Sequence, residues 1–291
     1  MIFHVGLLMV KFTTINKNIT RSLLEKITNI LCTIQNTIKK FKLACLHKRA
    51  ICTQRNQRGE IQFDGLTILY TDMLSWYIEY KDIFVNRIYH FETNNPTPYI
   101  IDGGGCIGMS ALYFKSIYPN SKILCFEPDE EIFKILDSNI FTNNLKDITL
   151  VKAGLADQIG TVYFQSDGID GGKIIESIGN TQTRIPTVRL SDYVDKPVDF
   201  LKLNIEGQEL PVLQELENSG SLKKIKKLVI EYHGWAGGEQ KLGELLTILE
   251  RNHFRYLVHD FDAETCSTSK PPFHIDLKNP WFCLIYAEQS E

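Results

Sequence analysis

The stretch that decides the fold is Tyr99-Ile100-Ile101-Asp102-Gly103-Gly104-Gly105-Cys106-Ile107-Gly108. An apolar run ends in an acid, four glycines follow within six residues, and a helix-forming sequence resumes at Met109. Glycines let the backbone turn sharply and let a ligand come close, because they carry no Cβ atom. The spacing of Gly103, Gly105 and Gly108 matches G-x-G-x-x-G, which predicts a strand, a tight turn and a helix that bind a nucleotide. A βα turn without a ligand is the plainer alternative.

Strand-like and helix-like segments alternate after this stretch. Strands are expected at residues 121–126, 148–152, 198–203, 228–232, 254–258 and 282–287, and helices at 109–120, 130–143, 210–217 and 239–252. Further short strands are expected at 160–164 and 185–190, around a glycine-rich loop at 167–172. This loop and the segment 266–274 are the candidate covers of a pocket. Such alternation predicts an α/β fold with a mostly parallel sheet and helices on both faces.

The ends of the predicted strands are where a ligand is expected, because open α/β sheets bind ligands beyond their carboxyl ends. The residues there are Asp102, Gly103, Gly104, Gly105, Gly108, Glu127, Ala153, Gly154, Asn204, Glu206, His233 and His259-Asp260. Glu127 follows Asp102 by 25 residues, at a position where an acid accepts hydrogen bonds from ribose hydroxyls. Alternatively, Glu127 is a surface acid at the start of the next helix.

Two adenosine cofactors fit this pattern, a nicotinamide dinucleotide and S-adenosylmethionine. The charge of Asp102 distinguishes them, since an anion before the first glycine repels a pyrophosphate but attracts the sulfonium and ammonium groups of S-adenosylmethionine. The sequence therefore favours a methyl donor, and a nicotinamide-dependent oxidoreductase is the alternative.

Three segments carry a family resemblance. Ile101–Gly108 resembles the D-x-G-A-N-x-G loop of the FkbM-type methyltransferases, and Phe126-Glu127-Pro128 resembles their F-E-P. Asp199–Glu209 is similar to their D-x-x-K-x-D-x-E-G-x-E segment, and Arg189–Tyr193 to the T-L-D-x segment before it. The resemblance covers about residues 96–270 and implies a class I methyltransferase fold, Rossmann-like and seven-stranded, with an antiparallel last hairpin. It also implies methyl transfer from S-adenosylmethionine, most often to a hydroxyl oxygen of a small molecule or glycan.

The candidate catalytic residues are Asn204, Glu206 and His233. Removing the proton of an alcohol needs a positioned base, and a carboxylate or an imidazole can act as one. The alternatives are that His233 is structural and that Glu206 only favours a helix dipole. Asn204 stands where the family has Asp, so a non-catalytic cofactor-binding domain is a further alternative. No spacing typical of metal ligands accompanies Glu206.

The N-terminal part is distinguished by its charge. Residues 1–58 hold eleven Lys and Arg and one acid, a net charge of +10, whereas the remainder holds 21 bases and 34 acids, a net charge of −13. A helix is expected at residues 22–43, with an apolar seam at heptad spacing. It is expected to dock on the domain or on a second copy; the alternatives are that it lies on an anionic membrane or is a flexible arm. The predicted parts are this extension (1–58), a lead-in (59–95) and the main domain (96–291). Within the lead-in, aromatic and apolar residues recur near helical spacing from Met73 to Phe91, which predicts a helix.

The cysteines and the overall charge limit the location and the partners. Seven scattered cysteines without a C-x-x-C motif indicate neither a zinc site nor a disulfide framework. The apolar opening, Met1–Val10, lacks the flanks of a signal peptide. The net charge of −3 favours no nucleic-acid partner. A cytoplasmic protein is expected.

Overall fold

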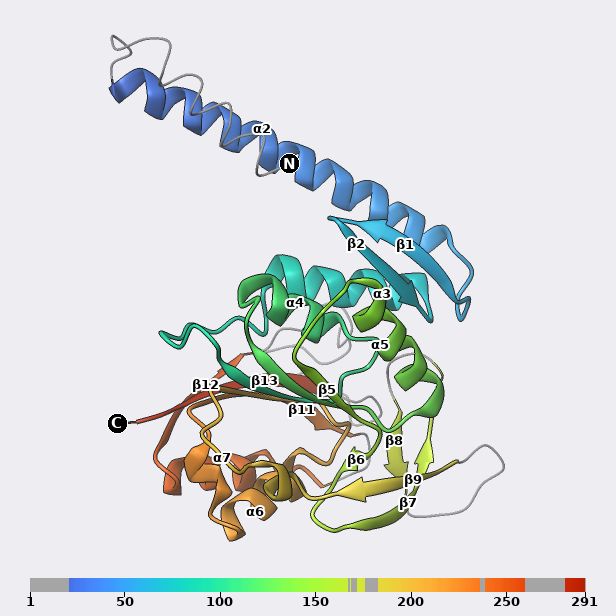
Figure 1. Ribbon diagram of the computed structural model, residues 1–291, viewed down its shortest axis with the longest axis vertical. Helices are drawn as coiled ribbons and strands as arrows, with labels where there is room; N and C mark the ends of the chain where they lie inside the picture. Colours follow the sequence, from blue (N-terminus) through green and yellow to red (C-terminus); the bar gives the residue numbers. More distant parts are fainter. Residues whose placement is uncertain are drawn as a thin grey trace. The chain divides into compact units, whose positions relative to one another are not determined.

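The computed structural model describes residues 21–166, 168, 172–175, 183–235, 239–259 and 281–290 (Figure 1). The chain forms two compact units, with the boundary between Cys52 and Thr53. The predicted boundary after residue 58 thus lies six residues inside the second unit, which also contains both predicted parts 59–95 and 96–291.

The first unit contains the helix α2 (Arg21–Cys52), which is longer than the predicted helix at 22–43. Among its described side chains, the large apolar residues Ile30, Ile34 and Phe41 are exposed. Within the described residues, no helix is both long and apolar enough to cross a membrane.

The centre of the second unit is a seven-stranded sheet of order β12-β13-β11-β10-β3-β4-β5. Its strands are β3 (Tyr99–Gly103), β4 (Lys122–Phe126), β5 (Ile148–Val151), β10 (Phe200–Leu203), β11 (Lys227–Gly234), β12 (Phe254–His259) and β13 (Trp281–Gln289). All neighbours pair in parallel except β13, which is antiparallel to both β11 and β12. The predicted seven-stranded, mostly parallel sheet with an antiparallel last hairpin is therefore confirmed.

Helices cover both faces of this sheet. They are α4 (Met109–Ile117) and α5 (Glu130–Thr142) on one face, and α6 (Glu209–Asn218) and α7 (Leu242–Arg251) on the other (Figure 1). Central strands buried from both sides become continuously apolar, and all four residues of β10 are buried. Ile101, Leu203 and Leu213 join the core on one side of the sheet.

The direction in which the chain adds strands reverses between β3 and β10. From β3 the chain continues outward to β4 and β5, and it later returns to place β10 on the other side of β3. This reversal is the topological switch point, where the loops after two adjacent strands diverge and leave a crevice. The glycine stretch follows β3, so it lies at this crevice as predicted.

A second, four-stranded sheet has the order β6-β9-β7-β8. Its strands are β6 (Gly154–Leu155), β7 (Gly160–Gln165), β8 (Lys173–Ile175) and β9 (Thr183–Val188). The sequence indicates β7 and β9 but not β6 and β8, because two or three residues are too few to show a period. Most of the glycine-rich loop at 167–172, Asp260 and the whole segment 266–274, which the sequence suggests as a pocket cover, fall outside the described residues.

The lead-in begins with a hairpin of β1 (Gly59–Phe63) and β2 (Leu66–Tyr70), followed by α3 (Met73–Tyr80) and the π-helical turn η1 (Lys81–Asn86). Sequence spacing predicts one helix from Met73 to Phe91, but helical structure ends at Asn86. Arg87 adopts a left-handed conformation with φ 60°, and the Ile88 N–H bonds back to the Asp82 carbonyl. This stop sends the following residues toward the sheet.

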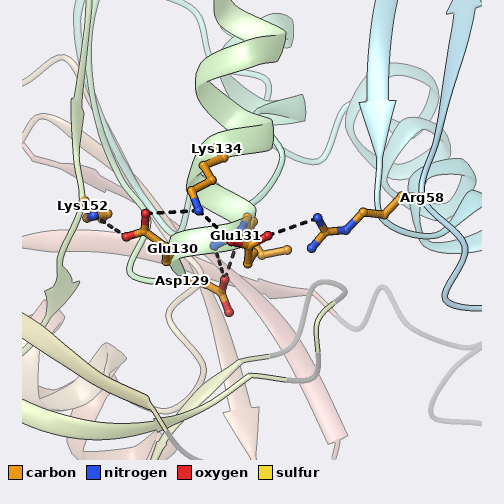
Figure 2. A network of polar contacts seen from close by, with 7 residues as sticks. Arg58, Asp129, Glu130, Glu131, Lys134 and Lys152 are labelled. Atoms are coloured by element: carbon orange, nitrogen blue, oxygen red, sulfur yellow. Dashed lines mark hydrogen bonds and ion pairs between the residues drawn. The ribbon is translucent and has the colours of Figure 1, made fainter.

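The N-terminus of α5 fixes where the chain turns after β4. The Asp129 carboxylate accepts hydrogen bonds from the N–H groups of Glu131 and Ile132, an N-cap that typically contributes about 1 kcal/mol. Around it lies a network of exposed ion pairs made by Arg58, Glu130, Glu131, Lys134 and Lys152 (Figure 2). Exposed pairs contribute little individually, so the cap is the element that positions the turn.

Candidate active site

A cavity opens at the carboxyl ends of β3, β4 and β10. The segments that follow the strands of the central sheet, up to the first residue of β6, contribute Gly104, Cys106, Glu127, Pro128, Asp129, Ala153, Gly154, Asn204, Ile205 and Glu206. From the second sheet, Phe164, Ile174 and Ile185 form an apolar wall. The cavity thus combines polar strand ends with one apolar side, which is the usual composition of a small-molecule site.

The glycines of the decisive stretch divide into two groups. Gly104 lines the cavity, whereas Gly103, Gly105 and Gly108 are not among its described lining residues. A Cβ atom at Gly105 would lie 2.3 Å from the Cys125 sulfur, and one at Gly103 would lie 2.9 Å from leucine side chains. These two positions therefore need glycine for internal packing.

Gly104 lies where the turn after β3 approaches β10. It has φ +89°, and a Cβ atom there would lie 1.9 Å from the carbonyl oxygen of Asn204. The N–H groups of Gly104 and Gly105 both bond to the Phe126 carbonyl. The backbone donors of this turn are thus held by β4 instead of pointing toward a ligand.

Asp102 lies behind the cavity and is fully buried. It accepts a hydrogen bond from the Ser110 hydroxyl, and its Oδ1 lies 3.1 Å from the Nζ of Lys202. Lys202 is also buried and donates to the Gly104 carbonyl. Although burial lowers the pKa of Lys202, the attraction of Asp102 raises it above its usual value. Because this cation balances the charge of Asp102, that charge does not distinguish a methyl donor from a dinucleotide.

Glu127 presents its carboxylate at the cavity. Its two oxygens accept hydrogen bonds from the backbone N–H groups of Cys106 and Asp129, each at 2.9 Å. Burial raises its pKa to about 7, although these two hydrogen bonds lower it. A carboxylate oxygen can accept a second hydrogen bond, so Glu127 retains acceptor capacity toward a ligand.

The loop after β10 presents Asn204 and Glu206. Asn204 Oδ1 is buried and accepts no hydrogen bond among the residues that the structure describes. Glu206 and Gly207 are both left-handed, with φ 56° and 101°. The buried carboxylate of Glu209 accepts hydrogen bonds from the N–H groups of Ile205 and Gly207. Glu209 therefore holds the bend that directs Glu206.

His233 is buried at the end of β11 and lies against this loop. Its Nδ1 is 3.1 Å from Glu209 Oε1, and its Nε2 is 3.4 Å from Glu206 Oε2 and 3.9 Å from Glu231 Oε1. Burial lowers the pKa of His233, but the three carboxylates raise it to about 9. At neutral pH the ring is an imidazolium, which already carries the proton that a base must accept. Glu206 is the carboxylate of this group that lines the cavity.

Comparison with known proteins identifies the domain. The family model "Methyltransferase FkbM domain" matches residues 102–256. The chain belongs to the FkbM methyltransferase family. It is 28% identical over 211 residues to "Methyltransferase sdnD" of Sordaria araneosa, covering 56% of this chain and 80% of that protein. It is 28% identical over 165 residues to "Methyltransferase 1" of Beauveria bassiana, covering 48% of this chain and 66% of that protein.

Solved structures were also compared. A methyltransferase FkbM from Methylobacillus flagellatus gives a TM-score of 0.44 at 19% identity, over 67% of this chain and 45% of that one. TYW2 of M. jannaschii in complex with AdoMet gives a TM-score of 0.45 at 12% identity, over 82% and 89%. The family membership itself makes this chain a methyltransferase domain that uses S-adenosylmethionine.

The cavity residues of this FkbM domain fit that cofactor. Glu127 has acceptor capacity for the two ribose hydroxyls. The unpartnered, buried Oδ1 of Asn204 is an acceptor for the ammonium group. Phe164, Ile174 and Ile185 offer an apolar wall for a heteroaromatic base. Within the part of the chain that the structure describes, no group of three or more His, Cys, Asp or Glu residues is arranged to hold a metal ion.

The roles of several site residues of this FkbM domain could not be read from the sequence. Lys202 is the Lys of the D-x-x-K-x-D-x-E-G-x-E segment, but only the register of β10 against β3 shows that it pairs with Asp102. Glu209 lies in the motif that carries Glu206. Tyr89 has no such signal, because only the fold brings it to Glu231, with its hydroxyl 3.3 Å from Oε2. His259, at the end of the edge strand β12, is exposed and is not among the described residues that line the cavity.

Proposed function

We propose that this FkbM domain is an O-methyltransferase that transfers a methyl group from S-adenosylmethionine to a hydroxyl of a small molecule or glycan. The observation that carries the proposal is Glu206, a carboxylate that lines the cofactor cavity and lies 3.4 Å from an imidazolium nitrogen. A carboxylate so placed is a suitable base for a hydroxyl proton.

The division of roles follows from these contacts. Bound S-adenosylmethionine supplies the electrophilic methyl group. Glu127 and Asn204 would hold the cofactor, and Glu206 would take the proton of the acceptor hydroxyl. His233 fixes the orientation of Glu206 and remains charged, since Glu209 holds its Nδ1 proton. Correct orientation of reacting groups alone contributes several kcal/mol to a displacement reaction.

The electrostatics of the glycine turn disfavour the nicotinamide alternative. A pyrophosphate requires free N–H donors and no anion nearby. Here the N–H groups of Gly104 and Gly105 bond to Phe126, and the N–H of Cys106 bonds to the carboxylate of Glu127. Equilibrium dialysis with labelled S-adenosylmethionine, compared with NADH fluorescence on mixing, separates the two alternatives.

A tritiated-methyl transfer screen tests the reaction itself. The expected result is label in a hydroxyl-bearing small molecule or glycan of a cell extract, and its release by chemistry that cleaves methyl ethers. Label on nitrogen, or on carbon, would refute O-methylation but leave the family assignment intact. Binding without any transfer would favour the non-catalytic alternative, in which replacing Asn204 by Asp is expected to restore activity.

For α2 we propose a role in association instead of catalysis. The exposed apolar residues Ile30, Ile34 and Phe41 recur on one side at spacings that suit a second copy of the helix. Sedimentation of the full chain is expected to show a dimer that Phe41→Ser weakens. Binding of the monomer to anionic vesicles would favour a membrane contact instead.

A further inference from the structure

Beyond Glu206 and His233, a line of mostly buried polar groups continues through Glu231, whose side chain is 15% exposed. Glu231 lies two residues before His233 on β11, so both side chains project from the same face of the strand. Glu231 Oε1 is 3.9 Å from His233 Nε2, and Glu231 Oε2 accepts a hydrogen bond from the Tyr89 hydroxyl at 3.3 Å. The line therefore runs from the cavity through Glu206 and His233 to Glu231 and Tyr89.

Negative charges outnumber positive charges along this line. Three carboxylates face His233, namely Glu206, Glu209 and Glu231. Lys202 also acts on Glu231, but its closest carboxylate is Asp102 at 3.1 Å. An added proton is stabilised within such an excess of negative charge, and burial raises the pKa of Glu231.

Of the two N–H protons of the His233 imidazolium, the one on Nε2 is available for transfer. Its Nδ1 proton is directed at Glu209, which is itself fixed by two backbone N–H groups. Its Nε2 proton lies between Glu206 at 3.4 Å and Glu231 at 3.9 Å. The longer distance exceeds a normal hydrogen bond by about 1 Å, so the Glu231 carboxylate must move toward Nε2 when it accepts the proton.

We propose that Glu231 stores the proton that Glu206 removes from the acceptor, and that His233 relays it. The inference rests on the proposed O-methylation. The acceptor O–H bond breaks and its proton passes to Glu206. The Nε2–H bond of His233 then breaks toward Glu231, while the Glu206 proton forms a new Nε2–H bond. Glu206 and the imidazolium are thereby restored, Glu231 is a neutral acid, and the proton returns to solvent by the reverse path.

Tyr89 is the positioning residue of this relay. Its hydroxyl holds Glu231 Oε2, which leaves Oε1 directed at His233. Burial and the neighbouring Glu231 raise the pKa of Tyr89 well above its usual value, so the phenol remains a donor. Tyr89 precedes the matched family domain, which begins at residue 102. Burial and the neighbouring Glu231 also raise the pKa of Tyr286, on β13.

The experiment compares Glu231→Gln and Tyr89→Phe with the exposed control Glu250→Gln in the full chain. NMR titration of ¹³C-labelled imidazoles, with His233→Gln to assign the signal, needs no substrate. Removing the Glu231 charge is expected to lower the pKa of His233 from about 9 to about 8, and the control is expected to leave it unchanged. Tyr89→Phe is expected to raise the pKa of the Glu231 carboxyl, followed by its infrared band.

Kinetics complete the test once an acceptor is labelled. Glu231→Gln is expected to lower kcat about tenfold and to shift the pH profile, with the affinity for S-adenosylmethionine unchanged. An unchanged His233 pKa in Glu231→Gln would overturn the relay even if methyl transfer to oxygen is found. Conversely, failure of transfer by the unaltered protein would refute the proposed function, while the titration still reports whether the two side chains are coupled.

Discussion

Lys202 and Asp102 stand opposite each other on the adjacent parallel strands β10 and β3, with 3.1 Å between Nζ and Oδ1. Both side chains are buried, at 3% and 0% exposure. The pair joins the two strands at the switch point, and the same ammonium group bonds to the carbonyl of Gly104. The Asp102–Lys202 pair therefore fixes the conformation of the glycine turn that follows β3.

Breaking this pair is expected to be costly. Lys202→Met leaves Asp102 buried without its cation, and loss of one partner of a buried pair typically destabilises by about 3–5 kcal/mol. Urea denaturation measures the loss. The control is Lys226→Met, which breaks the pair with Asp199 at a half-exposed ammonium and is expected to cost about 1 kcal/mol or less. Equal losses in the two variants would contradict the assigned role of Lys202.

Glu127 is expected to make cofactor binding depend on pH. Its pKa of about 7 lies above the usual value, so the carboxylate that is proposed to accept the ribose hydroxyls is lost as the pH falls through 7. Affinity for S-adenosylmethionine, measured by calorimetry, is expected to decrease from pH 8 to pH 6. Glu127→Gln is expected to bind about tenfold more weakly and without this pH dependence. Glu130→Gln, three residues away and exposed, serves as the control and is expected to behave as the unaltered protein.

Glu206 is expected to affect turnover more than binding. Glu206→Gln removes the base while preserving its size, so kcat is expected to fall about 100-fold or more, with the dissociation constant of S-adenosylmethionine nearly unchanged. Tritium transfer measures kcat, and equilibrium dialysis measures the dissociation constant. Glu239→Gln, at a side chain 85% exposed, is the matched control. A fall in affinity with unchanged kcat would assign Glu206 to the cofactor instead.

His233 is expected to couple stability to pH. Its pKa is raised to about 9 in the folded protein, from 6.5 in the unfolded chain. A raised pKa means that the contribution is fully present below pH 6.5 and is lost as the pH rises through 9. The loss is on the order of 3 kcal/mol. Urea denaturation between pH 6 and pH 9.5 is expected to show it, and His233→Gln is expected to flatten this part of the profile.

Removing residues 1–50 is expected to leave cofactor binding intact. These residues belong to the compact unit that precedes Thr53, whereas the residues that line the cavity all belong to the other. Calorimetry of the shortened chain is expected to return the affinity of the full chain. Loss of affinity with an unchanged circular dichroism spectrum would show that α2 contributes to the site.

The fold was largely predictable from the sequence, because its signals are local. A strand that ends in Asp102 and a turn rich in glycine specify the first βα unit, and alternating periods specify the rest. The reasoning that residues at strand ends converge also holds for Glu206 and His233. These two lie 3.4 Å apart although 27 positions separate them in the chain.

The parts that could not be predicted depend on non-local contacts. The charge of Asp102 suggested a cofactor contact, but only the register of β10 reveals that Lys202 neutralises it. An isolated histidine is neutral at pH 7.5, but the carboxylates around His233 keep it protonated at that pH. The period of the sequence does not show that helical structure after Met73 ends at Asn86, which places Tyr89 outside the helix.

The end of helical structure at Asn86 bears on how much of the chain before the family domain an active enzyme is expected to need. The left-handed Arg87 directs the chain so that Tyr89 reaches Glu231, which lies 142 positions later. A protein shortened to start at Pro96 would retain every family motif and lose this phenol. If the proposed relay operates, the smallest active piece is expected to extend upstream of the family domain, at least as far as the loop that carries Tyr89.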